Sequence, residues 1–140
     1  PYKRSINTSM LETLKFEIDL HTAYQETPPK ITISVNDNIK FNENLLKRKI
    51  ITFEHTLNKE NMLIIDRQNK PENSKQDLFI NSIKIDGIDL RNLIWSKSIF
   101  THTDGREVIG ETWLGLNGTW KLNFNGPFWQ FMMDWVNGKV

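Results

Sequence analysis

KITISVNDNIKF, residues 30–41, alternates apolar and polar side chains on both sides of a short polar centre. A period of two puts alternate side chains on opposite faces of a β-strand, so the isoleucines and the valine of residues 30–35 share one face. Asn36-Asp37-Asn38 is typical of a tight turn, because Asn and Asp adopt positive φ more readily than most residues. The stretch therefore predicts a β-hairpin with one buried face.

Alternation, or a short apolar run bounded by turn residues, recurs along the rest of the chain. We expect residues 50–57 to pair with residues 62–67, and the turns Asp86-Gly87 and Asn117-Gly118 to join further hairpins. Roughly eight or more short strands of this kind predict an all-β fold. We expect an antiparallel β-sandwich of jelly-roll type, with a closed barrel as the alternative. The other expected strands are residues 13–20, 78–85, 88–95, 107–116 and 119–124.

The last segment has a different pattern. Pro127 suits the first position of a helix, residues 128–136 are apolar on nearly every side, and Asn137-Gly138 is a typical helix end. An apolar helix must be covered on all sides, so we predict that residues 127–137 dock partly on a neighbouring subunit, with burial inside their own domain as the alternative. The candidate interface residues are Phe128, Trp129, Met132 and Trp135.

Length and composition exclude several classes of protein. A chain of 140 residues predicts one domain, residues 1–140, in which residues 1–12 form an N-terminal arm. The absence of Cys excludes disulfides and thiolate metal sites, and a net charge of +1 argues against a nucleic-acid partner. No apolar run is long enough to span a membrane, and no apolar segment follows the first five residues, so we expect neither a membrane partner nor a secretory signal.

The sequence offers little catalytic chemistry. No known nucleophile, phosphate-binding or metalloprotease motif is present, and the three histidines lie in separate segments. We therefore predict a protein that is not an enzyme and has no cofactor. Ca²⁺ is the open alternative, because Asp86-Gly87-Ile88-Asp89 and Asn36-Asp37-Asn38 carry oxygen side chains, although turn chemistry explains both stretches. The basic run Lys47-Arg48-Lys49 is interpreted as a solvated loop or the start of a strand.

The five tryptophans are the unusual feature of the composition, and four of them fall between residues 113 and 135. Burial in the core is the default for a Trp at strand or helix spacing. An indole exposed on the face of a sandwich is instead a flat, rigid surface on which a sugar ring can stack. The candidate glycan-binding residues are Trp95, Trp113 and Trp120, of which Trp95 and Trp113 lie nearest to loops.

Three stretches carry a resemblance to known proteins: KITISVNDN at 30–38, IKIDGIDL at 83–90, and WLGLNGTW at 113–120 followed by PFW at 127–129. Together they resemble small proteins encoded by marine phages, which are similar to β-sandwich carbohydrate-binding modules, some of which hold sugars through Ca²⁺. The resemblance spans residues 30–136. Residues 101–106 form a shorter loop than in those proteins, which removes one candidate ligand-binding rim.

Two functions follow from the residues and the resemblance together. The first is a non-catalytic structural protein of a phage virion, made in the host cytoplasm and placed as a capsid decoration or a tail-associated module. It implies other virion proteins as partners, self-association, and cell-surface glycan as a further partner. The alternative is a stand-alone carbohydrate-binding module that recognises a polysaccharide with or without Ca²⁺. A glycan-active enzyme is the third hypothesis, and no residue favours it.

Overall fold

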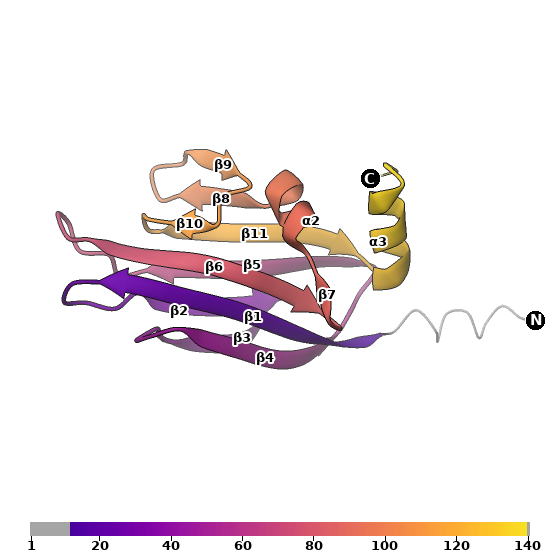
Figure 1. The fold of residues 1–140 in the computed structure, drawn as a ribbon, viewed down its shortest axis with the longest axis horizontal. Helices are drawn as coiled ribbons and strands as arrows, with labels where there is room; N and C mark the ends of the chain where they lie inside the picture. The colour runs from indigo at the N-terminus through magenta and orange to yellow at the C-terminus, as the bar shows by residue number, and fades with distance from the viewer. Residues whose placement is uncertain (1–11, 140) are drawn as a thin grey trace, which may run out of the picture.

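The computed structural model describes residues 12–139, which form two antiparallel sheets packed face to face (Figure 1). The sheet nearer the viewer, here the front sheet, has the order β10-β6-β1-β4, and β7 pairs with β6. The back sheet has the order β3-β2-β5-β11-β8-β9. The predicted antiparallel β-sandwich with a short C-terminal helix is confirmed. The strands are β1 (Thr13–Tyr24), β2 (Lys30–Val35), β3 (Asn38–Asn44), β4 (Lys49–Thr56), β5 (Glu60–Gln68), β6 (Gln76–Ile85), β7 (Ile88–Asp89), β8 (Ile99–His102), β9 (Glu107–Ile109), β10 (Trp113–Leu114) and β11 (Gly118–Asn125), and the helices are α2 (Arg91–Lys97) and α3 (Phe128–Val136).

The core lies between the two sheets and follows the alternation of the strands. In β2 the residues Ile31, Ile33 and Val35 are fully buried, and Phe16 and Ile18 of β1 face them from the front sheet. Burial of each such side chain contributes roughly 1.5–3 kcal/mol, so the period-two pattern is the main source of stability. The remaining fully buried apolar residues of the strands are Leu20, Leu63, Ile65, Leu78, Ile83, Ile85, Leu114, Trp120 and Leu122.

Two of the predicted hairpin turns are confirmed. Asn36 and Asp37 have φ of 51° and 67° between the paired residues Val35 and Asn38. Asp86 and Gly87 have φ of 48° and 79° at the β6–β7 turn. Two successive residues with positive φ give the turn a twist that matches the twist of the two flanking strands. Dipeptides that favour positive φ therefore predict two-residue hairpins.

The predicted pairing of residues 50–57 with 62–67 is wrong. Strand β4 pairs with β1 in the front sheet, whereas β5 pairs with β2 and β11 in the back sheet. The connection crosses the core instead of forming a hairpin loop, because Leu57 is fully buried and its N–H donates to the carbonyl of Glu12 at 2.7 Å. The three residues 57–59, with a bend at Lys59, span the roughly 10 Å between packed sheets.

The predicted strand 88–95 is also wrong beyond its first two residues. After β7 the carboxylate of Asp89 accepts a hydrogen bond from the N–H of Arg91, and the chain continues as helix α2. Leu90, Leu93 and Ile94 are buried. Their spacing of three and four residues is a helical period that the apparent alternation hides.

The predicted strand 107–116 splits into β9 and β10, which belong to different sheets. The break falls at Gly110, which has φ of 78° and passes so close to α2 that a Cβ would lie 2.4 Å from the carbonyl oxygen of Trp95. Asn117-Gly118 is not a hairpin turn, because β11 pairs with β5 and β8. Glycine is needed at position 118 because the backbone of Thr101 passes close to it: a Cβ on Gly118 would lie 2.4 Å from the carbonyl oxygen of Thr101.

Helix α3 closes one end of the sandwich. The backbone N–H of Phe128 donates to the Glu12 carboxylate at 2.7 Å, which satisfies a free donor of the first helical turn. The end of the helix is as predicted, with Asn137 as its cap and Gly138 at φ of 74°. Neither helix of the described chain is long and apolar enough to cross a membrane. Of the expected N-terminal arm, residues 1–11 lie outside the described residues.

Candidate functional site

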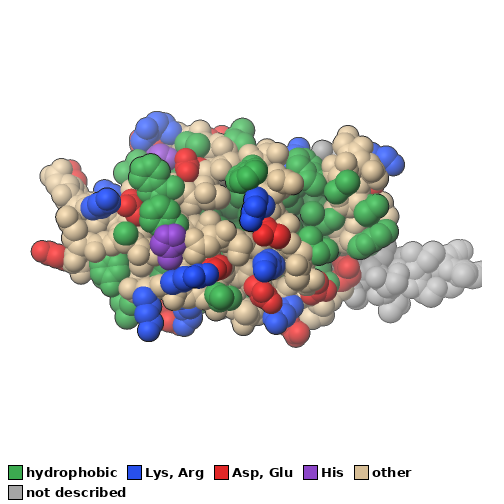
Figure 2. Space-filling model, viewed as in Figure 1, with side chains coloured by type: hydrophobic (Ala, Val, Ile, Leu, Met, Phe, Trp, Pro, Cys, Tyr) green, Lys and Arg blue, Asp and Glu red, His purple; other side chains and the backbone are tan. Residues whose placement is uncertain are grey.

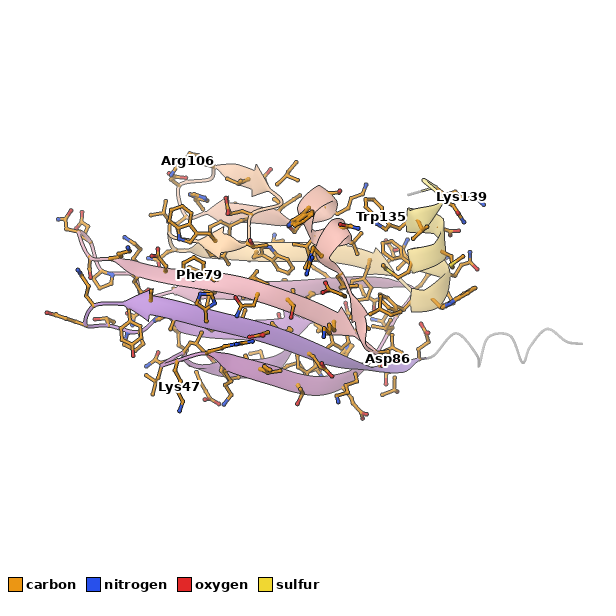
Figure 3. All side chains as sticks on the ribbon, in the orientation of Figure 1. Lys47, Phe79, Asp86, Arg106, Trp135 and Lys139 are labelled. Atoms are coloured by element: carbon orange, nitrogen blue, oxygen red, sulfur yellow. The ribbon has the colours of Figure 1, made fainter. Side chains whose placement is uncertain are left out.

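Three aromatic side chains lie in a row on the outer face of the front sheet. Trp113 of β10 is paired with Phe79 of β6, and Phe79 is paired with His21 of β1. Paired residues of neighbouring strands share a face, and Phe79 lies on the side of β6 that faces the viewer (Figure 3). The His21 ring stacks on Phe79 with 4.5 Å between ring centroids and 10° between planes. These three residues are called the aromatic row below.

Trp113 is exposed but held in place. Its side chain is 56% exposed, and its indole Nε1–H donates to Asp77 Oδ1 at 3.1 Å. The edge of the indole lies against the backbone of Gly115, where a Cβ would be 3.4 Å from two atoms of the ring. A fixed indole loses little conformational freedom when a ligand covers it, so the ring is a preformed stacking surface.

A polar network continues the aromatic row along the same face. His21 Nδ1 lies 2.6 Å from Asn81 Oδ1, and Asn81 Nδ2 donates to Asp19 Oδ1 at 3.1 Å. Since the Asn81 amide nitrogen donates to a carboxylate, its oxygen is the acceptor toward His21 Nδ1. Arg48 donates to both oxygens of Asp19, from Nε at 3.0 Å and from Nη2 at 2.6 Å.

The network depends on an irregularity of the sheet and on a charge. The register of β1 and β6 shifts between Asp19 and Leu20, which leaves Asn81 as the extra residue of a β-bulge beside them. The hydrogen bond from Arg48 is the largest cause that holds the pKa of Asp19 below its usual value. Asp19 therefore stays ionised at neutral pH and acts as an acceptor.

Two hollows border this network. The larger, about 610 Å³, is shallow and is lined by His21, Arg48, Asn81 and neighbours from the loop before β4. The smaller, about 170 Å³, lies between β6 and α2 and includes Asn81 and Trp95. Asn81 lines both, so the hollows adjoin, and Figure 2 shows hydrophobic, histidine and basic side chains side by side on this face. The front-face site comprises Trp113, Phe79, His21, Asn81, Asp19, Arg48 and Trp95.

The structure separates the three tryptophans predicted to bind glycan. Trp113 belongs to the aromatic row, and Trp95, 57% exposed on α2, lines the smaller hollow. Trp120 is fully buried between the sheets, so its proposed contact with glycan is wrong. The prediction missed His21, Asn81 and Arg48, because only the register of β1 and β6 and the loop before β4 bring them together.

The candidate interface residues of α3 differ in their exposure. Phe128 is buried, and Met132 and Trp135 are partly buried against the core of their own domain, so most of the predicted interface is turned inward. Trp129 remains 64% exposed on the opposite side of the helix. The exposed ridge of α3 is therefore a different set from the predicted one and consists of Trp129, Met133 and Val136.

Comparison with known proteins gives the fold a context. No known protein family and no curated protein matches the sequence. The structure is similar to the selenomethionine form of vCBM60, with a TM-score of 0.56, 13% identity and coverage of 78% of this chain and 89% of that one. The vCBM60 structure comes from work on an evolutionary link between two families of calcium-dependent carbohydrate-binding modules. It is also similar to vCBM60 in complex with galactobiose, with a TM-score of 0.52, 12% identity and coverage of 78% and 98%. In fold, the sandwich resembles carbohydrate-binding modules.

The calcium dependence of those neighbours raises the question of a calcium site here. Ca²⁺ takes six to eight oxygen ligands, usually with several carboxylates. No group of three or more His, Cys, Asp or Glu side chains gathers within residues 12–139. In the two stretches predicted as alternatives, Asp86 and Asp89 accept backbone hydrogen bonds from Lys15 and Arg91, and Asn36 accepts one from Met62. Neither of these two stretches therefore supplies the carboxylate-rich ligand set that a calcium ion usually takes.

Proposed function

We propose that the protein is a non-catalytic glycan-binding module that holds a polysaccharide at the front-face site. The observation that carries this proposal is the exposed indole of Trp113, fixed by Asp77 beside the stacked rings of Phe79 and His21. The apolar C–H face of a sugar packs on such rings. The adjoining Asn81 and Arg48 supply the donors and acceptors that sugar hydroxyls require.

The chemistry of this face favours binding over catalysis. Glycoside hydrolysis commonly needs two carboxyl groups, one of which donates a proton to the leaving oxygen. Here Asp19 is bound to Arg48 and Asp77 to the indole of Trp113. A carboxylate whose pKa is lowered by a guanidinium is a poor proton donor at neutral pH.

Replacing Trp113 with alanine is expected to weaken glycan binding by roughly 2 kcal/mol, about thirtyfold, because a central stacking surface is lost. Since more than half of the side chain is exposed, the free energy of unfolding should fall by about 1 kcal/mol or less. Isothermal titration with galactan, xylan, glucan and mannan oligosaccharides measures the binding, and urea denaturation measures the stability.

Trp129→Ala is the matched control, because Trp129 is similarly exposed but lies on α3. It should bind like the unaltered protein, and EDTA should leave the binding of both proteins unchanged. Unaltered binding by Trp113→Ala would contradict the proposed site, and loss of binding in EDTA would show that a metal takes part.

A second candidate function, a structural part of a phage virion, is favoured by the exposed ridge of α3. Trp129, Met133 and Val136 form an apolar surface on a helix whose other side is already packed against the sandwich. Such a surface suits contact with a neighbouring protein in an assembly, including another copy of the chain.

This candidate predicts that purified particles of the phage that encodes the chain contain it in fixed stoichiometry. Quantitative mass spectrometry against the major capsid protein measures the ratio. Many copies indicate a capsid decoration, and a few indicate a tail component. Absence from the particles would exclude the virion role and leave the glycan-binding module.

A further inference from the structure

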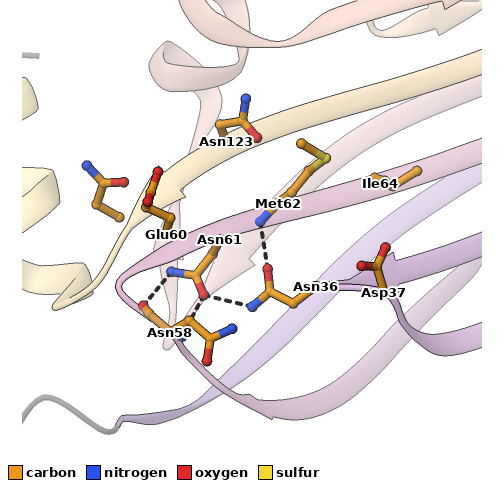
Figure 4. A pocket seen from close by; sticks show the side chains of 9 residues that line it. Asn36, Asp37, Asn58, Glu60, Asn61, Met62, Ile64 and Asn123 are labelled. Carbon is orange, nitrogen blue, oxygen red and sulfur yellow. Dashed lines mark hydrogen bonds between the residues drawn. The ribbon is translucent and has the colours of Figure 1, made fainter.

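A hollow larger than the two described above lies on the other side of the sandwich, on the outer face of the back sheet. It measures about 650 Å³ and is floored by Met62 and Ile64 of β5, which alternate with the fully buried Leu63 and Ile65. Polar side chains surround this floor, and five of them are asparagines (Figure 4). The polar lining residues are Asn36, Asp37, Asn58, Glu60, Asn61, Asn123 and Asn125.

A smaller hollow of about 250 Å³ extends this one towards the C-terminal helix. It is lined by Asn123, Phe124 and Asn125 of β11, Phe131 of α3 and Lys97 of α2. Because Asn123 and Asn125 line both hollows, the two form one groove that crosses β5 and β11 and ends at α3. It is called the amide groove below.

One wall of the amide groove is rigid. Asn36 Nδ2 donates to Asn61 Oδ1 at 2.8 Å, and Asn61 Nδ2 donates to the carbonyl oxygen of Asn58 at 2.9 Å. The backbone N–H of Met62 donates to Asn36 Oδ1 at 2.8 Å, which ties the β2–β3 turn to β5. These bonds exist without a ligand, so binding in the groove does not have to order this wall.

The opposite wall carries free amides. Asn123 and Asn125 are exposed on β11, where they alternate with the buried Leu122 and Phe124, and within the described residues neither side chain joins the network (Figure 4). Each amide offers two N–H donors and an acceptor oxygen. A pair of amides two residues apart on one strand presents this set twice along the groove.

The charges of the groove indicate which ligand it suits. Asp37 and Glu60 lie on opposite sides of the larger hollow, and Lys97 is the basic residue of the smaller one (Figure 4). This balance gives an anionic glycan no cluster of cations to pair with. Vicinal hydroxyls match neutral amides, and the apolar floor of Met62, Ile64 and Phe131 matches the C–H face of a sugar ring.

We propose that the amide groove is a second binding site, specific for a neutral oligosaccharide. Since the groove and the front-face site lie on opposite sheets, each holds its own stretch of glycan. The chain then joins two glycan strands, and this bivalency rests on the proposed function of the front-face site. Joined modules of this kind gain avidity and cross-link polymers without any new contact.

The test uses the full chain labelled with ¹⁵N and titrated with neutral galactan, xylan, glucan and mannan hexaoses. The side-chain amide signals of Asn123 and Asn125 are expected to shift with a saturating curve that is independent of the curve for the Trp113 indole N–H. The double variant Asn123→Ala, Asn125→Ala lacks these two reporters, so its groove binding is read from the side-chain amide of Asn61, which lines the same hollow. Binding in the groove should be weaker by about tenfold or more, because hydrogen bonds to the ligand are lost. It should leave the Trp113 curve unchanged.

Asn44→Ala is the matched control, because Asn44 is an exposed amide on β3 of the same sheet and lines neither hollow. It should change neither curve. Shifts at Trp113 alone would overturn the second site and leave the proposed function intact. Shifts in the groove alone would support the second site and overturn the front-face site, and no shift at either place with any hexaose overturns both.

Discussion

Replacing Arg67 with alanine is expected to lower the free energy of unfolding by about 3–5 kcal/mol, because it removes the centre of a buried hydrogen-bond network. Arg67 of β5 is fully buried, and burial lowers the pKa of its guanidinium to about 10. Its Nη1 donates to Asn117 Oδ1 at 3.0 Å, and its Nη2 donates to the carbonyl oxygen and to Oε1 of Gln76 at 2.6 and 3.0 Å. Within the described residues no carboxylate forms an ion pair with it.

The partners of Arg67 connect three loops at one end of the sandwich. Gln76 Nε2 donates to the carbonyl oxygens of Thr27 and Asn69, at 2.7 and 2.8 Å. Asn117 Oδ1 also accepts the backbone N–H of Lys70 at 2.9 Å. Loss of the guanidinium therefore removes the side-chain donor of both Gln76 oxygens, leaves Asn117 Oδ1 with the Lys70 N–H alone, and loosens the loops that this network fixes.

Urea denaturation measures the effect, and Arg67→Met is the informative comparison. Methionine fills much of the volume but donates no hydrogen bond. The free energy of unfolding of Arg67→Met should therefore lie between that of the unaltered protein and that of Arg67→Ala. Because the folded pKa is lowered to about 10, the unfolded chain binds more protons above that pH. The unaltered protein should therefore gain stability relative to Arg67→Met as the pH rises above about 10. A cost below about 1 kcal/mol for Arg67→Ala would contradict this role.

Replacing Trp120 with alanine is expected to cost a similar amount, about 3–5 kcal/mol, through the cavity that it leaves. Trp120 is fully buried on β11 and is paired with Ile65 of β5 and Phe100 of β8. Its indole Nε1–H is buried and finds no hydrogen-bond partner among residues 12–139. Trp120→Phe removes this unpaired donor and leaves a smaller cavity, so it should cost only about 1–2 kcal/mol.

The Trp120 variants also separate a core role from a binding role. Trp120→Phe is expected to bind glycan as the unaltered protein does, in titrations like those used for Trp113→Ala. If Trp120→Phe loses glycan binding while it remains folded, the assignment of Trp120 to the core is wrong.

The sequence predicts the local parts of the fold well and the pairing of distant strands poorly. The turns at Asn36-Asp37 and Asp86-Gly87 are set by residues that favour positive φ, and they form where predicted. Asn117-Gly118 has the same local signature but lies between strands of different sheets. Its glycine is needed because Thr101, far away in the sequence, passes close to it. A contact of that kind leaves no mark in the local pattern.

The candidate site shows the same difference between local features, which the sequence predicts, and contacts between distant segments, which it does not. The sequence points to Trp113 and Trp95, because indoles near loops are exposed more often than indoles in the middle of strands. It also contains the reason to exclude Trp120, which shares one strand face with Leu122 and Phe124. The rest of the front-face site depends on the β-bulge at Asn81 and on the reach of Arg48, and neither follows from spacing.

The hydrogen bond between Glu12 and Phe128 has a consequence for the connectivity of the chain. It brings the first described residue to the start of the last helix, so the beginning of β1 and helix α3 lie at the same end of the sandwich (Figure 1). A linker that runs back along α3 can join residue 139 to residue 12, and new termini can be opened at the exposed tip formed by Glu72 and Asn73, where no strand is interrupted. The sandwich is defined by which strands are neighbours, and a circularly permuted chain keeps every one of those neighbours.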